Sequence, residues 1–140
     1  MKRILVIDDE AFVARLIGQV LQAANVEHIL EYCSDGGLGR AMADQGHYDL
    51  ITLDLGMPHM DGVEALQELK RNPKSAHIPV VVVTGKRNPY LHERVMELGA
   101  VAVVTMPFDT RELGNILRLI IARAEAEPPN SRGPSSLPPA

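Results

Sequence analysis

The sequence predicts an α/β protein, a doubly wound parallel sheet of five strands with five helices on its two faces. Short strand-like runs occur five times along the chain, and the first, at residues 3–7, is unbroken rather than alternating, as expected for a strand covered on both faces. Each run is followed by a segment whose apolar residues recur at helical spacing. Strict alternation of strand and helix gives parallel strands joined by right-handed crossovers. The length of 140 residues suffices for one domain with a single core.

The first two strand–helix units carry clear signals for where their helices begin. The strand at residues 3–7 runs into three acidic residues, any of which can cap the helix that follows. The strand at 28–32 leads to Ser34 and Asp35, two candidate caps for a helix over 36–45. Three glycines near the start of this helix each weaken it by up to ~1 kcal/mol relative to alanine. The sequence therefore specifies its first turn only weakly.

The remaining three units include the most strand-like run of the chain. A strand at 48–53 precedes a helix over 62–71, which Asn72 and Pro73 should end. The run 80–84 is apolar on both faces, which places it inside the sheet. The other expected elements are a helix from Pro89 to about Leu98, a strand over 101–105 and a last helix capped by Asp109 or Thr110.

Composition and charge indicate which binding partners this chain could have and in which cellular compartment it is expected. The formal net charge is −4, and the basic residues are scattered rather than gathered in a stripe, which argues against direct binding of nucleic acid. No apolar run approaches the ~18 residues needed to cross a membrane. The first apolar run is too short for a signal peptide, and the single cysteine rules out an internal disulfide. We therefore expect a cytoplasmic protein without membrane contact.

The chain divides into two segments of different composition. Residues 1–125 contain all the strand and helix patterns and should form the folded domain. Residues 126–140 are rich in proline and serine and offer too little apolar surface to offset the entropy of ordering. We expect them to form a disordered tail or a truncated linker to a further domain.

Acidic and hydroxyl side chains follow the predicted strands, where a parallel sheet places its ligand site. Asp8 and Asp9 follow the first strand, Asp54 follows the third, and Thr84 ends the fourth. Taken alone, Asp54 would be better interpreted as a turn residue that bonds its own backbone. Because the carboxyl ends of parallel strands lie at one edge of the sheet, we expect three carboxylates and a hydroxyl to converge there.

Such a cluster of carboxylates indicates a cation. At ~5 Å separation and an effective dielectric near 20, each pair repels by about 3 kcal/mol. Three acids therefore require protonation, movement or a bound ion. Oxygen ligands without histidine or cysteine suit Mg²⁺. A metal there would let Asp54 meet an incoming phosphoryl group as a carboxylate nucleophile, with Thr84 donating its hydroxyl to a phosphoryl oxygen.

These motifs resemble those of a receiver domain of the two-component response-regulator family, in particular of stand-alone, chemotaxis-regulator-like members. The motifs are the acidic pair Asp8-Asp9, the segment from Asp54 to Gly62, Thr84, and Pro107-Phe108 before the last helix. The resemblance implies a flavodoxin-like fold with strand order 2-1-3-4-5, and with two helices on one face and three on the other. It also implies phosphoryl transfer from a sensor histidine kinase or a phosphotransfer protein.

The resemblance assigns roles to individual residues. Asp54 would be the phosphoacceptor, Pro58 would shape the loop after it, and Gly62 would let the next helix begin close by. The implied Mg²⁺ ligands are Asp9, Asp54 and the backbone carbonyl of Gly56, with Asp8 acting at the metal site largely through water. Output would pass to an unknown protein through protein contacts, and a homodimer could form through the fourth helix, fifth strand and fifth helix. The receiver would phosphorylate and dephosphorylate itself without a multiple-turnover substrate.

The sequence departs from the family pattern at two positions. Family members carry a lysine directly before the proline of the last loop, where this chain has Met106, which has neither charge nor donor. Losing one donor to a developing anion costs about 3 kcal/mol. Val103 stands where many members carry a switch aromatic. Met106 is either a packing substitution or is compensated by Lys86 or Arg87, and His59 is either a solvated loop residue or a modulator of dephosphorylation.

Two further interpretations follow from these departures and from the carboxylate chemistry. The chain is alternatively an atypical receiver that does not switch and acts as a phosphorylation-independent interaction or dimerisation module. An aspartate nucleophile on an α/β sheet also suits a small-molecule phosphatase, although the chain has no insertion that would enclose a substrate.

Overall fold

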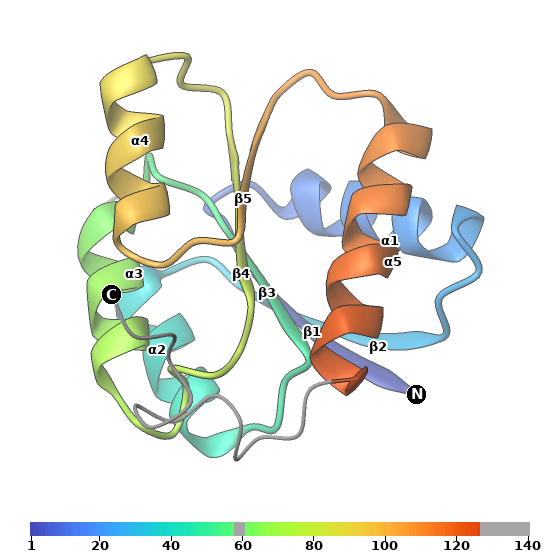
Figure 1. Ribbon diagram of the computed structural model, residues 1–140, viewed down its shortest axis with the longest axis horizontal. Helices are drawn as coiled ribbons and strands as arrows, with labels where there is room; N and C mark the ends of the chain where they lie inside the picture. Colours follow the sequence, from blue (N-terminus) through green and yellow to red (C-terminus); the bar gives the residue numbers. More distant parts are fainter. Residues whose placement is uncertain (58–60, 127–140) are drawn as a thin grey trace.

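The computed structural model describes residues 1–57 and 61–126, and in these residues five strands alternate with five helices. The strands are β1 (Lys2–Ile7), β2 (His28–Cys33), β3 (Leu50–Leu53), β4 (Val80–Thr84) and β5 (Ala102–Thr105). The helices are α1 (Ala11–Ala23), α2 (Gly36–Gln45), α3 (Gly62–Arg71), α4 (Pro89–Glu97) and α5 (Thr110–Ala126). All paired strands are parallel, in the order β2-β1-β3-β4-β5 (Figure 1). The expected fold class and strand order are confirmed.

Most element boundaries agree with the sequence pattern, and one difference has a clear cause. β3 begins at Leu50 rather than at residue 48. The carboxylate of Asp49 accepts a hydrogen bond from the backbone N–H of Arg3 at 2.8 Å, so a side chain replaces the backbone acceptor that a longer strand would supply. At the other end of the fold, α5 extends to Ala126, one residue past the expected end of the domain.

Of the three helix caps expected from the sequence, two are observed and one is not. Asp35 caps α2 and Asp109 caps α5, each by accepting a backbone N–H at 2.9 Å, and α3 begins after the cap Asp61. The expected acidic cap of α1 is wrong, because Glu10 at its N-cap makes no side-chain hydrogen bond to the helix. Instead the Asp8 carboxylate accepts the backbone N–H of Glu10 at 2.9 Å, which fixes the turn between β1 and α1.

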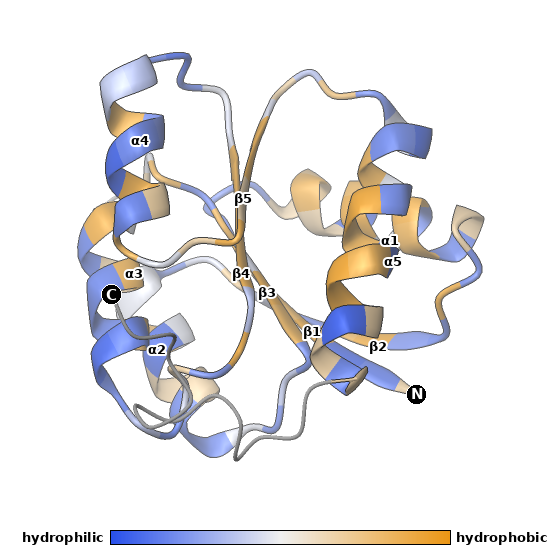
Figure 2. Ribbon diagram, in the orientation of Figure 1, coloured by the Kyte–Doolittle hydropathy of each residue, from blue (hydrophilic) through white to orange (hydrophobic). Residues whose placement is uncertain are grey.

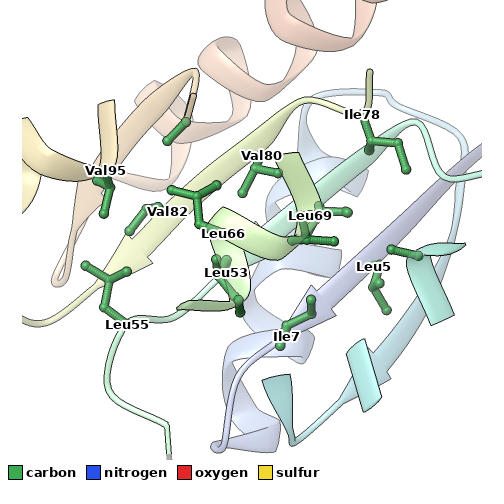
Figure 3. Packing of buried hydrophobic residues seen from close by; sticks show 14 of the residues in the cluster. Leu5, Ile7, Leu53, Leu55, Leu66, Leu69, Ile78, Val80, Val82 and Val95 are labelled. Atoms are coloured by element: carbon green, nitrogen blue, oxygen red, sulfur yellow. The ribbon is translucent and has the colours of Figure 1, made fainter. Parts of the chain in front are cut away.

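Two apolar clusters hold the helices on the sheet, one on each face. The α1/α5 core joins α1 and α5 to strand residues such as Ile4, Val6 and Val81, and the α2–α4 core joins α2, α3 and α4 to the opposite sides of the same strands. Figure 2 shows hydrophobic residues along the strands and on the helix sides that face them. In Figure 3, Leu66 and Leu69 of α3 point toward the sheet within the α2–α4 core. The expected arrangement, with two helices on one face of the sheet and three on the other, is therefore confirmed.

Glycine permits close packing at two helices. A Cβ atom at Gly39 would lie 2.6 Å from Cδ1 of Ile7, so one glycine that weakens α2 is also what lets α2 approach β1. A Cβ atom at Gly62 would lie 2.4 Å from the carbonyl oxygen of Asp54 and 2.5 Å from Cα of Leu55. The first turn of α3 thus lies directly against the backbone that carries Asp54.

None of the described helices, within residues 1–57 and 61–126, has both the length and the apolar character that a bilayer crossing requires.

The contact at Gly62 gives a stability prediction. Gly62→Ala places a methyl group against backbone atoms that cannot rotate away, and overpacking of this kind typically costs about 1–3 kcal/mol. Urea unfolding should therefore show a lower free energy of unfolding for Gly62→Ala. Gly85→Ala is the matched control, because no heavy atom lies within 4 Å of a Cβ there. Equal losses in the two variants would contradict this account of α3.

Candidate functional site

Three carboxylates meet at the carboxyl ends of β1 and β3. Asp8 and Asp9 follow β1, Asp54 follows β3, and the register pairs Ile7 with Leu53, so Asp8 and Asp54 lie level with each other. One carboxylate oxygen of each acid lies within 4.8 Å of those of the other two. Asp8 is buried, Asp54 is half-buried and Asp9 is exposed, so the cluster is open to solvent on one side. The structure brings together the three acids that the sequence singled out.

Burial and mutual repulsion disfavour full ionisation of the cluster. Burial raises the pKa of Asp8 to about 7, a hydrogen bond from the Glu10 backbone opposes this, and the charges of Asp54 and Asp9 add to it. The pKa of Asp54 is also raised, first by burial, although the backbone N–H groups of Leu55 and Gly56 partly offset this. A cation that lowers both pKa values is the chemical complement of such a site.

The donor set fits a hard divalent cation. The three acids supply only oxygen ligands, with two carboxylates partly or wholly removed from solvent and one exposed. Oxygen-only sites that keep part of their hydration suit Mg²⁺, which retains water when it binds to one or two carboxylates. The geometry therefore admits a metal together with an anionic group that enters from the open side.

Thr84 lies in the neighbouring strand at the same edge of the sheet. It ends β4, which pairs with β3 on one side and with β5 on the other. The residue is buried, and its hydroxyl oxygen accepts the backbone N–H of Lys86 at 3.1 Å. The hydroxyl hydrogen is not used by this bond, so the group keeps the capacity to donate.

Met106 and Val103 both have packing roles. The side chain of Met106 packs against the α1/α5 core beside Phe108, and Val103 packs against the α2–α4 core. The backbone of Met106 donates to the carbonyl oxygen of Thr84 at 2.8 Å, which ties the loop after β5 to the end of β4. These contacts agree with the interpretation of Met106 as a packing substitution, and they leave its position without a cation.

Two basic residues follow Thr84, and their side chains have different surroundings. The guanidinium group of Arg87 donates to the carbonyl oxygen of Met106 at 3.3 Å. Lys86 extends over the turn after Asp54: its Cε atom lies 3.5 Å from the point that a Cβ of Gly56 would occupy, and Oδ2 of Asp54 lies 4.0 Å from that same point. Both residues are candidates from the sequence alone, and the structure shows that only Lys86 lies beside the turn after Asp54.

One contact near the site was not anticipated from the sequence. Nε2 of His92 in α4 lies 2.7 Å from the carbonyl oxygen of Lys86. His92 shares no metal-ligand spacing with another histidine, so the sequence gives no signal for it. The contact is visible only in the structure, where α4 lies beside the loop. Pro58 and His59, to which the sequence assigned loop-shaping and modulating roles, lie outside the described residues.

Comparison with known proteins identifies similar chains. The family model described as the response regulator receiver domain matches residues 4–118. The chain is 32% identical over 123 residues to the response regulator ArlR of Staphylococcus saprophyticus, covering 88% of this chain and 54% of that protein. It is 33% identical over 113 residues to the chemotaxis protein CheY of Treponema pallidum, covering 79% and 76%.

A solved structure supports the same relationship. The CheY-like response regulator receiver domain protein of Methanospirillum hungatei superposes with a TM-score of 0.78 at 26% sequence identity, covering 91% of this chain and 99% of that one. The chain spans about half the length of the first curated relatives it matches, 54% in the case of ArlR.

The raised pKa of Asp8 predicts how stability depends on pH. A carboxyl group with a higher pKa in the folded chain favours folding below its unfolded pKa of about 4, and this contribution is lost as pH rises through about 7. Metal-free protein should therefore lose stability over this range, by at most about 4 kcal/mol. Asp8→Asn keeps the acceptor for Glu10 and should flatten the dependence.

Urea unfolding in EDTA at pH 5 and pH 8 measures this effect in both proteins. Asp8→Asn should be the more stable of the two at pH 8. If the free energy of unfolding changes equally in the wild type and in Asp8→Asn between the two pH values, Asp8 does not have a raised pKa in the folded protein.

Proposed function

The chain belongs to the response regulator receiver domain family of two-component systems, and from this premise we propose that it accepts a phosphoryl group on Asp54 in a Mg²⁺-dependent reaction. The observation that carries the proposal is the convergence of Asp8, Asp9 and Asp54 within 4.8 Å at the carboxyl edge of the sheet. A carboxylate in that position is accessible from solvent on one side and can meet a phosphoryl donor.

The acids and the turn after Asp54 would hold the metal. Asp8, Asp9, Asp54 and the backbone carbonyl of Gly56 are the proposed ligands, and oxygen is the only ligand type among them. When bound, Mg²⁺ supplies positive charge that offsets the repulsion among the acids and among the phosphoryl oxygens. The backbone N–H groups of Gly56 and Leu55 favour the ionised form of the Asp54 carboxylate, because they lower its pKa against the effect of burial.

The reaction is a displacement at phosphorus. An oxygen of the Asp54 carboxylate forms a bond to phosphorus while the phosphorus–nitrogen bond of a phosphohistidine donor breaks. The electron pair of the broken bond stays with the imidazole nitrogen, which takes a proton from solvent, and the product is an acyl phosphate. Thr84 would donate its hydroxyl hydrogen to a phosphoryl oxygen, and the N–H of Lys86, which its oxygen accepts, leaves that hydrogen unused.

The proposed phosphoryl donor is a sensor histidine kinase or a phosphotransfer protein, and output passes through protein contacts in the cytoplasm. Exposed apolar side chains on α4 and α5, among them Tyr90 and Leu119, make a homodimer through α4, β5 and α5 a reasonable form of that output. We propose no direct binding of nucleic acid by this chain, whose net charge is −4. The family match favours this switchable phosphoacceptor over a phosphorylation-independent module.

Phosphorylation can be tested with a small donor that needs no partner. Wild-type protein incubated with acetyl phosphate and Mg²⁺ should gain the mass of one phosphoryl group, measured on the intact protein. Asp54→Asn should gain none, because it lacks the nucleophile, and omission of Mg²⁺ should suppress the adduct. An adduct of equal yield in Asp54→Asn, or its absence from the wild type, would refute the proposed function.

A further inference from the structure

The position of Lys86 suggests how the site works without a lysine at position 106. We propose that the Lys86 ammonium group contacts the phosphoryl oxygens on Asp54 and supplies the positive charge that Met106 cannot. This inference rests on the proposed function, because it concerns the phosphorylated form of the same aspartate.

The space above Gly56 is shared by Lys86 and Asp54. The point that a Gly56 Cβ would occupy lies 3.5 Å from Cε of Lys86 and 4.0 Å from Oδ2 of Asp54. The ammonium nitrogen is one bond beyond Cε, so it can be carried toward the acceptor by rotation of the last side-chain bonds. A side chain at position 56 would contact both groups, whereas glycine leaves this space open.

The backbone of Lys86 is fixed on both sides while its side chain is exposed. Its N–H donates to the hydroxyl oxygen of Thr84 at 3.1 Å, and its carbonyl oxygen lies 2.7 Å from Nε2 of His92. Within residues 1–57 and 61–126, no carboxylate lies within ion-pair distance of its ammonium group. Lys86 therefore has a set position and a charge that no described acid already engages.

The other basic residue of the loop is already engaged elsewhere. Arg87 donates to the Met106 carbonyl oxygen at 3.3 Å, on the side of the loop that faces β5. Met106 itself is packed against the α1/α5 core. Of the two loop cations that follow Thr84, Lys86 is thus the one whose side chain lies beside the turn after Asp54.

Phosphorylation would strengthen this contact. An acyl phosphate carries more negative charge than the carboxylate it replaces, and the ammonium group is a mobile point charge with three donors. Removal of a preorganised donor to developing charge typically lowers the rate 100-fold or more. Because Lys86 is exposed and its charge is screened by water, we expect a smaller effect, about tenfold.

The test compares rates of phosphorylation by acetyl phosphate at fixed Mg²⁺. Lys86→Met keeps most of the length of the side chain but removes its charge, and should lower the rate about tenfold. Lys86→Arg should keep most of the wild-type rate, because it keeps the positive charge. Arg87→Met is the matched control, and its rate should stay within about threefold of the wild type. Thermal unfolding of each variant shows whether the fold is intact.

A double variant shows whether the lower phosphorylation rate comes from the missing charge or from a change in structure. Met106→Lys introduced into Lys86→Met should recover the lost rate, because it returns a cation to the same edge of the sheet from the loop after β5 instead of the loop after β4. An unchanged rate in Lys86→Met, an equal loss in Arg87→Met, or no recovery in the double variant would overturn the role of Lys86. If the wild type forms no adduct, the proposed function fails as well, whereas normal adduct formation with an unaffected Lys86→Met refutes only this inference.

Discussion

The structure depends on one electrostatic constraint: three carboxylates held within 4.8 Å at the carboxyl edge of a parallel sheet. The backbone imposes this proximity, because Ile7 pairs with Leu53 and the next residue of each strand is an aspartate. Burial then raises the pKa values of Asp8 and Asp54. The fold therefore maintains an arrangement that is unfavourable by itself and becomes favourable when a cation and an anionic group share it.

The elements around the site serve this arrangement in different ways. Gly62 brings the first turn of α3 against the backbone of Asp54, which fixes the turn after β3. The two apolar cores hold α1 and α3 on opposite faces of the sheet, so the turn between β1 and α1 is anchored at both ends. Across the site, the backbone bond between Met106 and Thr84 links the ends of β5 and β4.

The sequence predicted the strand and helix pattern well because apolar periodicity reflects burial directly. It also predicted that Asp8, Asp9 and Asp54 would converge, since all parallel strands end at one edge. It could not predict the failed cap at Glu10, where the Asp8 carboxylate takes the N–H of the turn instead. Nor could it distinguish Lys86 from Arg87, because adjacent loop residues point in directions that only tertiary contacts determine.

Proton release on Mg²⁺ binding is the most direct test of this account. An acid whose pKa is about 7 is about half protonated at pH 7 and must lose that proton to bind the metal. Isothermal titration with Mg²⁺ in two buffers of different ionisation enthalpy measures the number released. We predict about half a proton at pH 7, falling toward zero at pH 8.5. Absence of Mg²⁺ binding, or binding whose heat is the same in both buffers at pH 7, would contradict the account.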